Sequence, residues 1–266
     1  MIENYITLKS SRSYGVSTMF FPKYIRDKIS ILYSFLRIVD NFVDQYPRRI
    51  EELYKAKEFI LNGIEHHIGD IENRVFNKFN ALMRETGIEH EWIEAFFRSM
   101  EYDIYKAEYT YRELLDYMYG SAEIVGMCIS RILRLDDSVL PGARLLGRGM
   151  QMINFVRDIY EDKKINRIYL PKEHREMFGV GELCMDSKLE RLIRFEIELA
   201  WGWIENGKRY FSEIPVPYRI PIKTATELYQ WIGMRIYQNP RSIMNNKIRP
   251  GYFTAIVYNI KNRIFQ

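Results

Sequence analysis

The sequence has few residues of the kinds that build covalent or cysteine-bound frameworks. Among 266 residues there are only two cysteines and four histidines, and Cys128 and Cys184 lie far apart without any metal-ligand spacing. A disulfide scaffold and a cysteine-based metal site are therefore excluded. We expect both cysteines to be free thiols, as in a protein of the cytoplasm.

Long apolar runs, leader sequences and linkers are also missing. No apolar run approaches the length of about 18 residues that a membrane span needs, and the first residues lack the basic start and apolar segment of a secretory signal. Nine prolines and fifteen glycines are scattered, and we find no repeat and no linker rich in serine, glycine or proline. We therefore expect a single domain over residues 1–266 and a cytoplasmic location.

The net charge of +4 is small, and the positive excess lies at the carboxyl end. Residues 241–266 contain five lysines and arginines and no acidic residue. Within this tail, Tyr252–Phe265 has apolar residues on one helical side and basic residues on the other, which predicts either a core helix or a basic helix lying on a membrane surface. We expect no nucleic-acid partner, and the sequence carries no signal for the oligomeric state.

Helical periods dominate the chain, and alternating strand patterns are scarce, so the sequence predicts an all-α protein. Three prolines at positions 215, 217 and 221 predict a turn. The predicted helices cover Ile29–Val43 after Pro22, Glu51–His67, Ile71–Glu85, Glu89–Lys106, Tyr111–Leu135, a segment beginning near Gly147, Asp186–Phe211, Ala225–Ile236 and Tyr252–Phe265.

One of these helices carries a stripe of polar residues. Gln151, Asn154, Asp158 and Asp162 are spaced at i, i+3, i+7 and i+11, so they share one side of the helix. Carboxylate and amide oxygens suit Mg²⁺, which takes few protein carboxylates together with waters and phosphate oxygens. The alternative is an ordinary solvated helix face.

A second stripe favours the metal interpretation. Tyr33, Arg37, Asp40 and Asp44 follow the spacing i, i+4, i+7 and i+11 on the first predicted helix. Sites in helical bundles are built from side chains on facing helices. Four facing carboxylates without cations would repel one another, so Mg²⁺ and arginines such as Arg157 would have to balance them.

Small residues cluster on the helix predicted for Tyr111–Leu135. Gly120, Ala122 and Gly126 interrupt an otherwise large and apolar helix, and glycine inside a helix costs roughly 1 kcal/mol relative to alanine. The small residues therefore indicate close approach, either by another helix or by a ligand.

Five motifs occur in the order and spacing of a known family. They read SSRSYG, FLRIVDNFVD, YMYGSAEIVG, GMQMINFVRDIYEDKKINRIYLPKE and ATELYQWIG. From about Ser11 to Arg235, the chain resembles the squalene/phytoene synthases. This resemblance implies an all-α isoprenoid-synthase-type helical bundle with a central cavity, and the head-to-head condensation of two prenyl diphosphates.

The resemblance also implies roles for individual residues. The metal ligands would be Asp40, Asp44, Asn154, Asp158 and Asp162. The substrate-binding residues would be Ser11, Ser13, Arg37, Gln151, Asn154, Arg157, Arg167, Tyr169 and Tyr229. Tyr119 would act in catalysis beside the four aspartates, and Asn41 departs from the family pattern, in which many members carry a second aspartate.

The expected reaction converts geranylgeranyl diphosphate to phytoene through prephytoene diphosphate, with Mg²⁺ or Mn²⁺ as the metal. The sequence shows no membrane anchor at its carboxyl end, which favours this branch over squalene synthesis, for which NADPH would be required. Three alternatives remain: squalene or dehydrosqualene synthesis from farnesyl diphosphate, another prenyl-diphosphate enzyme with adjacent aspartates, and a non-catalytic helical assembly factor with the same fold.

Overall fold

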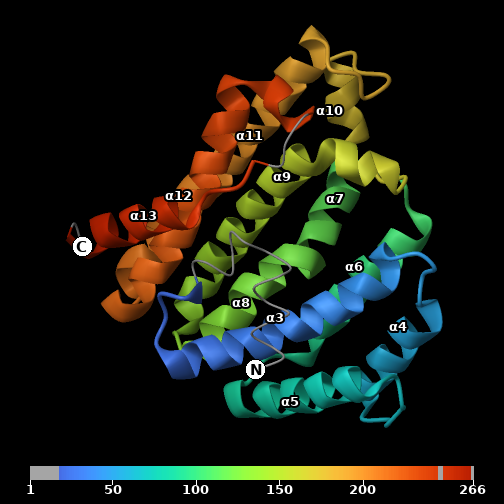
Figure 1. The fold of residues 1–266 in the computed structure, drawn as a ribbon, viewed down its shortest axis with the longest axis vertical. Helices are drawn as coiled ribbons and strands as arrows, with labels where there is room; N and C mark the ends of the chain where they lie inside the picture. The colour runs from blue at the N-terminus through green and yellow to red at the C-terminus, as the bar shows by residue number, and fades with distance from the viewer. Residues whose placement is uncertain (1–17, 245–247, 265–266) are drawn as a thin grey trace.

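The computed structural model describes residues 18–244 and 248–264, and within them the chain is helical without any strand beyond one isolated bridge (Figure 1). The all-α prediction is therefore confirmed. The principal helices are α3 (Lys23–Asp44), α4 (Ile50–Lys57), α5 (Asp70–Thr86), α6 (His90–Tyr105), α7 (Tyr111–Met118), α8 (Ile124–Ile132), α9 (Leu140–Lys164), α10 (Lys172–Met177), α11 (Ser187–Lys208), α12 (Val216–Gln238) and α13 (Tyr252–Ile264). Short turns of other helix types are η1 (Glu58–Asn62), η2 (Tyr119–Glu123), η3 (Asp137–Val139), η4 (Arg209–Glu213) and η5 (Pro240–Met244).

Local sequence explains where several helices begin and end. The side chain of Thr110 accepts the N–H of Glu113, and Glu113 reciprocates at the backbone of Thr110, so α7 starts with a capping box. Gly87 ends α5 with a left-handed φ of 72°, which costs glycine little. Pro22 has a ψ of 148° and lies just outside α3, which begins at Lys23, six residues before the start of the predicted helix at Ile29.

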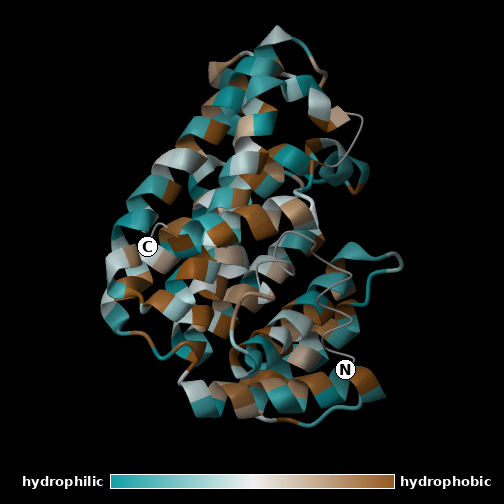
Figure 2. Ribbon diagram, turned by 60° about the vertical axis from the view of Figure 1, so that its left-hand side comes forward, coloured by the Kyte–Doolittle hydropathy of each residue, from teal (hydrophilic) through white to brown (hydrophobic). Residues whose placement is uncertain are grey.

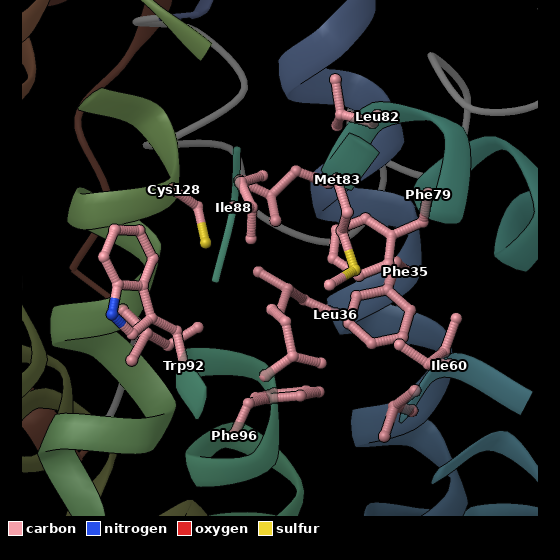
Figure 3. Close-up of a cluster of buried hydrophobic side chains, with 14 of the residues drawn as sticks. Phe35, Leu36, Ile60, Phe79, Leu82, Met83, Ile88, Trp92, Phe96 and Cys128 are labelled. Carbon is pink, nitrogen blue, oxygen red and sulfur yellow. The ribbon is translucent and has the colours of Figure 1, made fainter. Parts of the chain in front are cut away.

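Two hydrophobic clusters hold the helices together, and hydrophobic residues lie along the helices that form them (Figure 2). The amino-terminal cluster is formed by α3, α4, α5, α6 and α8, where Phe35 stacks on Phe79 with ring centroids 3.9 Å apart (Figure 3). The carboxy-terminal cluster joins α7, α9, α11 and α12 through residues such as Ile153, Ile197 and Ile232. Helix α9 packs against α8, α11 and α12, so it connects the two halves of the bundle.

Three predicted segments differ from the structure. The helix expected over Glu51–His67 ends at Asn62, because Gly63 takes a left-handed φ of 69°. The helix expected over Tyr111–Leu135 contains the π-helical turn η2. The predicted turn at the three prolines is wrong: α12 begins at Val216 and continues through Pro221, since its buried side packs against α9 and α11.

Helix α13 differs most from expectation. Its buried residues are Ala255, Asn259 and Asn262, whereas its apolar residues face outward. The prediction of a core helix is therefore wrong, because α13 is attached to α12 through polar contacts and the small Ala255–Leu228 contact, while its large apolar residues stay exposed.

Two sequence expectations concern cysteines and membrane spans. Cys128 is buried, Cys184 is exposed, and both are free thiols as expected. Over the described residues, every helix falls short of the length and apolar character needed to cross a bilayer.

Close packing explains one of the small residues, and this can be tested. A Cβ added at Gly120 would lie 2.1 Å from the carbonyl oxygen of Ala95 and 2.3 Å from Ser99 Oγ. We expect Gly120→Ala to lower the free energy of unfolding by about 1–3 kcal/mol, because α6 would have to move. Urea denaturation measures this change.

The matched control is Gly202, which lies inside α11 with no atom within 4 Å of an added Cβ. Gly202→Ala should be neutral or raise the free energy of unfolding by up to about 1 kcal/mol. Equal effects of the two substitutions would contradict the packing explanation.

Candidate active site

A cavity of about 320 Å³ lies between the two hydrophobic clusters. Helices α3, α9 and α12 each contribute both polar and apolar residues to its lining. The polar end is lined by Tyr33, Arg37, Asp40, Gln151, Asn154 and Tyr229. The apolar part includes Phe21, Phe96, Leu146, Phe211, Ile214 and Ile222.

Helix α9 forms a long wall of this cavity. Its lining residues extend from Asn154 at the polar end to Gly142, twelve positions earlier. At a rise of 1.5 Å per residue, this wall is about 18 Å long. Tyr210 closes the far end, since its ring atoms would lie 2.6 Å from a Cβ added at Gly142.

Small residues let this wall approach its neighbour. A Cβ at Gly126 would lie 2.5 Å from the carbonyl oxygen of Ala143, and one at Gly147 would lie 2.6 Å from that of Ala122. All four residues also line the cavity. Here, unlike at Gly120, close helix packing and room for a ligand are both supplied by the same residues.

At the polar end, Asp40 is held by an arginine of its own helix. Arg37 Nη1 donates to Asp40 Oδ2 at 2.5 Å. Burial, followed by repulsion from Asp44, raises the pKa of Asp40 to about 7, although Arg37 acts in the opposite direction. The site therefore stores unfavourable negative charge that an added cation would relieve.

Asp44 is bound by an arginine from a distant segment. Arg167, in the loop after α9, donates to the Asp44 carboxylate and also to the carbonyl oxygens of Val43 and Asp103, at 3.2 and 3.3 Å. The side chain of Arg167 is only 4% exposed. This contact ties the end of α9 to the end of α3.

The second aspartate pair is arranged differently. Arg157 Nε and Nη2 donate to the two oxygens of Asp158 at 2.9 and 2.6 Å, a bidentate pair between neighbours in sequence. Asp162 accepts the N–H of Arg167 at its backbone carbonyl, at 2.9 Å. Asp162 thus helps to turn the chain so that Arg167 points back toward α3.

Sequence reasoning missed Asp103, which lies behind these residues. Its side chain is 1% exposed and accepts the hydroxyls of Tyr169 and Tyr117 at 2.7 and 2.8 Å, with Arg167 Nε 3.5 Å away. Burial raises its pKa to about 6, against the effect of Arg167 and the two tyrosines. The sequence did contain a signal for its burial, because Asp103 lies seven residues after Phe96 and three after Met100, on the buried side of α6.

Two predicted tyrosines do not line the cavity that the structure describes. Tyr119 packs against the amino-terminal cluster, and Arg144 lies 5.0 Å from the centre of its ring. Tyr169 stacks on Phe155 behind the wall, with ring centroids 4.3 Å apart. Tyr117 lines the cavity instead. Ser11 and Ser13 lie outside the described residues.

The residues at the polar end suit a Mg²⁺ ion that takes its remaining ligands from a bound substrate. The described residues contain no group of three or more histidine, cysteine or acidic side chains able to enclose a metal ion. Magnesium commonly uses only one or two protein carboxylates and takes its other ligands from phosphates and water. Asn154 Oδ1 is buried without a hydrogen-bond partner at this end, which leaves an oxygen available to a ligand.

The fold and the site together define a class of protein. An all-α bundle surrounds a cavity in which Arg37 and Asp40 lie at a polar end and a long apolar interior follows, and this arrangement is that of an all-α prenyltransferase. The other predicted residues Asp44, Arg157, Asp158, Asp162 and Arg167 lie outside the lining of this cavity. The chain belongs to the squalene/phytoene synthase family, whose family model matches residues 7–251. It is therefore an enzyme of head-to-head prenyl diphosphate condensation.

Relatives of known activity agree with this assignment. The chain is 26% identical over 239 residues to a 15-cis-phytoene synthase from Paracoccus sp., covering 86% of this chain and 79% of that protein. It is 25% identical over 267 residues to a 15-cis-phytoene synthase from Synechocystis sp., covering 91% and 77%. A 4,4'-diapophytoene synthase from Staphylococcus haemolyticus is 28% identical over 234 residues, covering 84% and 81%.

Solved structures share the fold. A dehydrosqualene synthase in complex with a ligand superposes with a TM-score of 0.86 at 20% identity, covering 99% of this chain and 95% of that one. A squalene synthase from Alicyclobacillus acidocaldarius gives a TM-score of 0.75 at 22% identity, covering 92% and 94%. The isoprenoid-synthase fold with a central cavity is therefore confirmed.

The raised pKa of Asp40 predicts how charge affects stability. A carboxyl group with a pKa of about 7 in the folded state and 3.8 otherwise favours folding while it is protonated. This contribution is complete below pH 3.8 and is lost as the pH rises through 7. In metal-free protein, we expect Asp40→Asn to raise the melting temperature by roughly 2–4 °C at pH 8.

The same substitution should have little effect near pH 3, where Asp40 is mostly protonated in both states. Loss of the Arg37 pair should matter little, because both side chains are about one-third exposed, at 37% and 31%. Differential scanning calorimetry across this pH range tests the prediction, and an equal change at both pH values would contradict it.

Asp103 should contribute strongly to stability. Asp103→Ala would leave the buried hydroxyls of Tyr117 and Tyr169 without this acceptor and would remove the carboxylate 3.5 Å from Arg167 Nε, so we expect a loss of about 3–5 kcal/mol in the free energy of unfolding. The control is Asp116→Ala on α7, where the side chain is exposed and the change should stay within about 0.5 kcal/mol. Urea unfolding compares the two variants, and equal stability would show that Asp103 is not an anchor.

Proposed function

We propose that the protein condenses two molecules of geranylgeranyl diphosphate to phytoene, through prephytoene diphosphate, in a Mg²⁺-dependent reaction. The observation that carries this proposal is a cavity that joins a polar end, lined by Arg37, Asp40, Gln151 and Asn154, to a long apolar interior. A prenyl diphosphate has the same division between an anionic head and an apolar chain.

The residues at the polar end suit a diphosphate. Arg37, Arg157 and Arg167 each pair with an aspartate of the two stripes, and each can donate to diphosphate oxygens when a metal takes up the carboxylates. Mg²⁺ bound by Asp40, Asp44, Asp158 and Asp162, with Asn154 beside them, would neutralise the diphosphate and make it a better leaving group. Mn²⁺ is the alternative metal.

The apolar part suits the chemistry that follows. Cleavage of the bond between carbon 1 and the diphosphate oxygen of the first substrate yields an allylic cation, which the double bond of the second substrate attacks. Loss of a proton then closes the cyclopropane ring of prephytoene diphosphate. A second ionisation, rearrangement and proton loss give phytoene, and the released diphosphate can accept each proton.

Cations of this kind need protection from water. The aromatic rings of Phe21, Phe96 and Tyr117 line the cavity and can face a cation without reacting with it. Tyr117 lines the cavity and its hydroxyl is held by Asp103, so it is a second candidate, beside the predicted Tyr119, for the catalytic role of a tyrosine. Water is excluded by the same apolar walls.

The length of the cavity favours a twenty-carbon substrate. An extended carbon chain advances about 1.3 Å per bond. The sixteen-carbon backbone of a geranylgeranyl group is therefore about 19 Å long and that of a farnesyl group about 14 Å. The wall of about 18 Å between Asn154 and Gly142 matches the longer chain.

Alternatives give different products. Farnesyl diphosphate would yield dehydrosqualene, or squalene if NADPH supplies a hydride. The similarity to a 4,4'-diapophytoene synthase supports the dehydrosqualene alternative. An assembly factor with the same fold would yield no hydrocarbon at all. The retention of all four aspartates argues against this last alternative.

The test is incubation of the purified protein with Mg²⁺ and either geranylgeranyl or farnesyl diphosphate, with and without NADPH. We expect a forty-carbon hydrocarbon from geranylgeranyl diphosphate, detected by chromatography and mass spectrometry, with no need for NADPH. A thirty-carbon product only would overturn the proposed substrate. Failure to turn over either substrate, together with failure to bind inorganic diphosphate in the presence of Mg²⁺, would overturn the enzymatic proposal.

A variant connects turnover to the aspartate stripes. Asp158→Asn should lower turnover by more than about 100-fold, because the loss of a proposed metal ligand should weaken metal binding more than the loss of a residue that only orients a ligand. The exposed Asp116→Asn variant on α7 serves as the control and should turn over substrate at the parent rate.

A further inference from the structure

The outward side of α13 is apolar. Phe253 is 79% exposed and Ile264 is 67% exposed, and Ile256, Val257 and Ile260 between them are each about half exposed. These five residues follow helical spacing, so they form one continuous strip, here called the α13 strip. Contiguous apolar surface of this kind marks a place where something else binds.

The strip is not an accident of loose packing, because the opposite side of the helix is firmly attached. Asn262 is 1% exposed and its Nδ2 donates to Glu227 at 2.9 Å and to Thr224 Oγ1 at 3.3 Å. Asn259 reaches the same Thr224 hydroxyl at 3.5 Å, and Ala255 packs on Leu228. The helix therefore turns its polar side inward and its apolar side outward.

Positive charge accompanies the strip. Residues 248–264 contain Arg249, Lys261 and Arg263 and no acidic residue. Lys261 lies 5.5 Å from the centre of the Tyr258 ring and 3.2 Å from Glu227, next to the strip. A second copy of the chain placed on the strip would bring two such basic segments together, whereas anionic lipid headgroups would complement them.

The strip also lies close to the cavity. Pro221, Ile222 and Ala225 on one side of α12 line the cavity, while Thr224 and Leu228 on the other side carry α13. Phe20, adjacent to a cavity-lining residue, packs against the Leu228–Ala255 contact. Figure 1 places α13 at the periphery of the molecule, beside α12.

We propose that the α13 strip is a docking surface for an anionic lipid bilayer. The helix would lie in the plane of the bilayer surface, with its apolar residues among the acyl chains and its basic residues at the headgroups. This docking rests on α13 alone and goes beyond the proposed reaction. Since α12 separates the strip from the cavity by one helix, docking also places the cavity next to the phase in which prenyl substrates and a hydrocarbon product dissolve.

The test uses the full chain and sedimentation with vesicles. We expect binding to vesicles of phosphatidylcholine and phosphatidylglycerol to exceed binding to pure phosphatidylcholine by about tenfold or more, and to weaken as salt is added. The double variant Phe253→Ser with Ile260→Ser should reduce binding to the anionic vesicles by about tenfold or more. Arg249→Gln should reduce binding to anionic vesicles but leave binding to neutral ones unchanged.

The matched control is Ile71→Ser on α5, because Ile71 is 47% exposed, like Ile256 at 46%, but lies outside the strip. It should bind anionic vesicles as the parent does. Turnover of detergent-dispersed substrate should be unchanged in the double variant, so that a failure of the proposed reaction is detected separately from a failure of docking.

Two outcomes would overturn the docking proposal. One is that the parent protein binds neither kind of vesicle, or that the double variant binds as well as the parent. The other is that the parent is a dimer by analytical ultracentrifugation and the double variant is a monomer, which would make the strip an interface between copies of the chain.

Discussion

The aspartates at and beside the polar end of the cavity impose the constraint on which the rest of the structure depends. Each of three aspartates there is matched by an arginine: Asp40 by Arg37, Asp44 by Arg167 and Asp158 by Arg157. Without these cations, neighbouring carboxylates such as those of Asp40 and Asp44 would repel one another more strongly. The raised pKa of Asp40 shows that this compensation is incomplete, which leaves the site ready for a cation and an anionic substrate to enter together.

Arg167 shows how the same pairing supports the fold. It comes from the loop after α9, binds Asp44 on α3, and is supported by Asp103 on α6. Three segments distant in sequence therefore meet at one buried guanidinium group. The hydroxyls of Tyr117 and Tyr169 donate to Asp103, so the buried charged groups are in direct contact with aromatic residues. Electrostatics and cavity shape are consequently set by the same contacts.

The apolar surfaces of the molecule serve two different ends. In the cavity, small residues such as Gly126 and Gly147 let α8 and α9 approach closely while space remains between the two clusters. The α13 strip faces outward because α13 is attached to α12 through Asn259 and Asn262 on its opposite side. Both surfaces suit lipid-like molecules, one as substrate and one as surroundings.

The sequence by itself determined the helical class, most helix positions and the two aspartate stripes, because side-chain periodicity along a helix is a local property. Its motifs also identified the family. Tertiary structure alone decided what depends on which helix faces which. It placed Tyr117 rather than Tyr119 at the cavity, buried Asp103 beneath Arg167, and carried α12 through Pro221. It also turned α13 outward, since an amphipathic pattern predicts two sides but not which of them the neighbouring helix will cover.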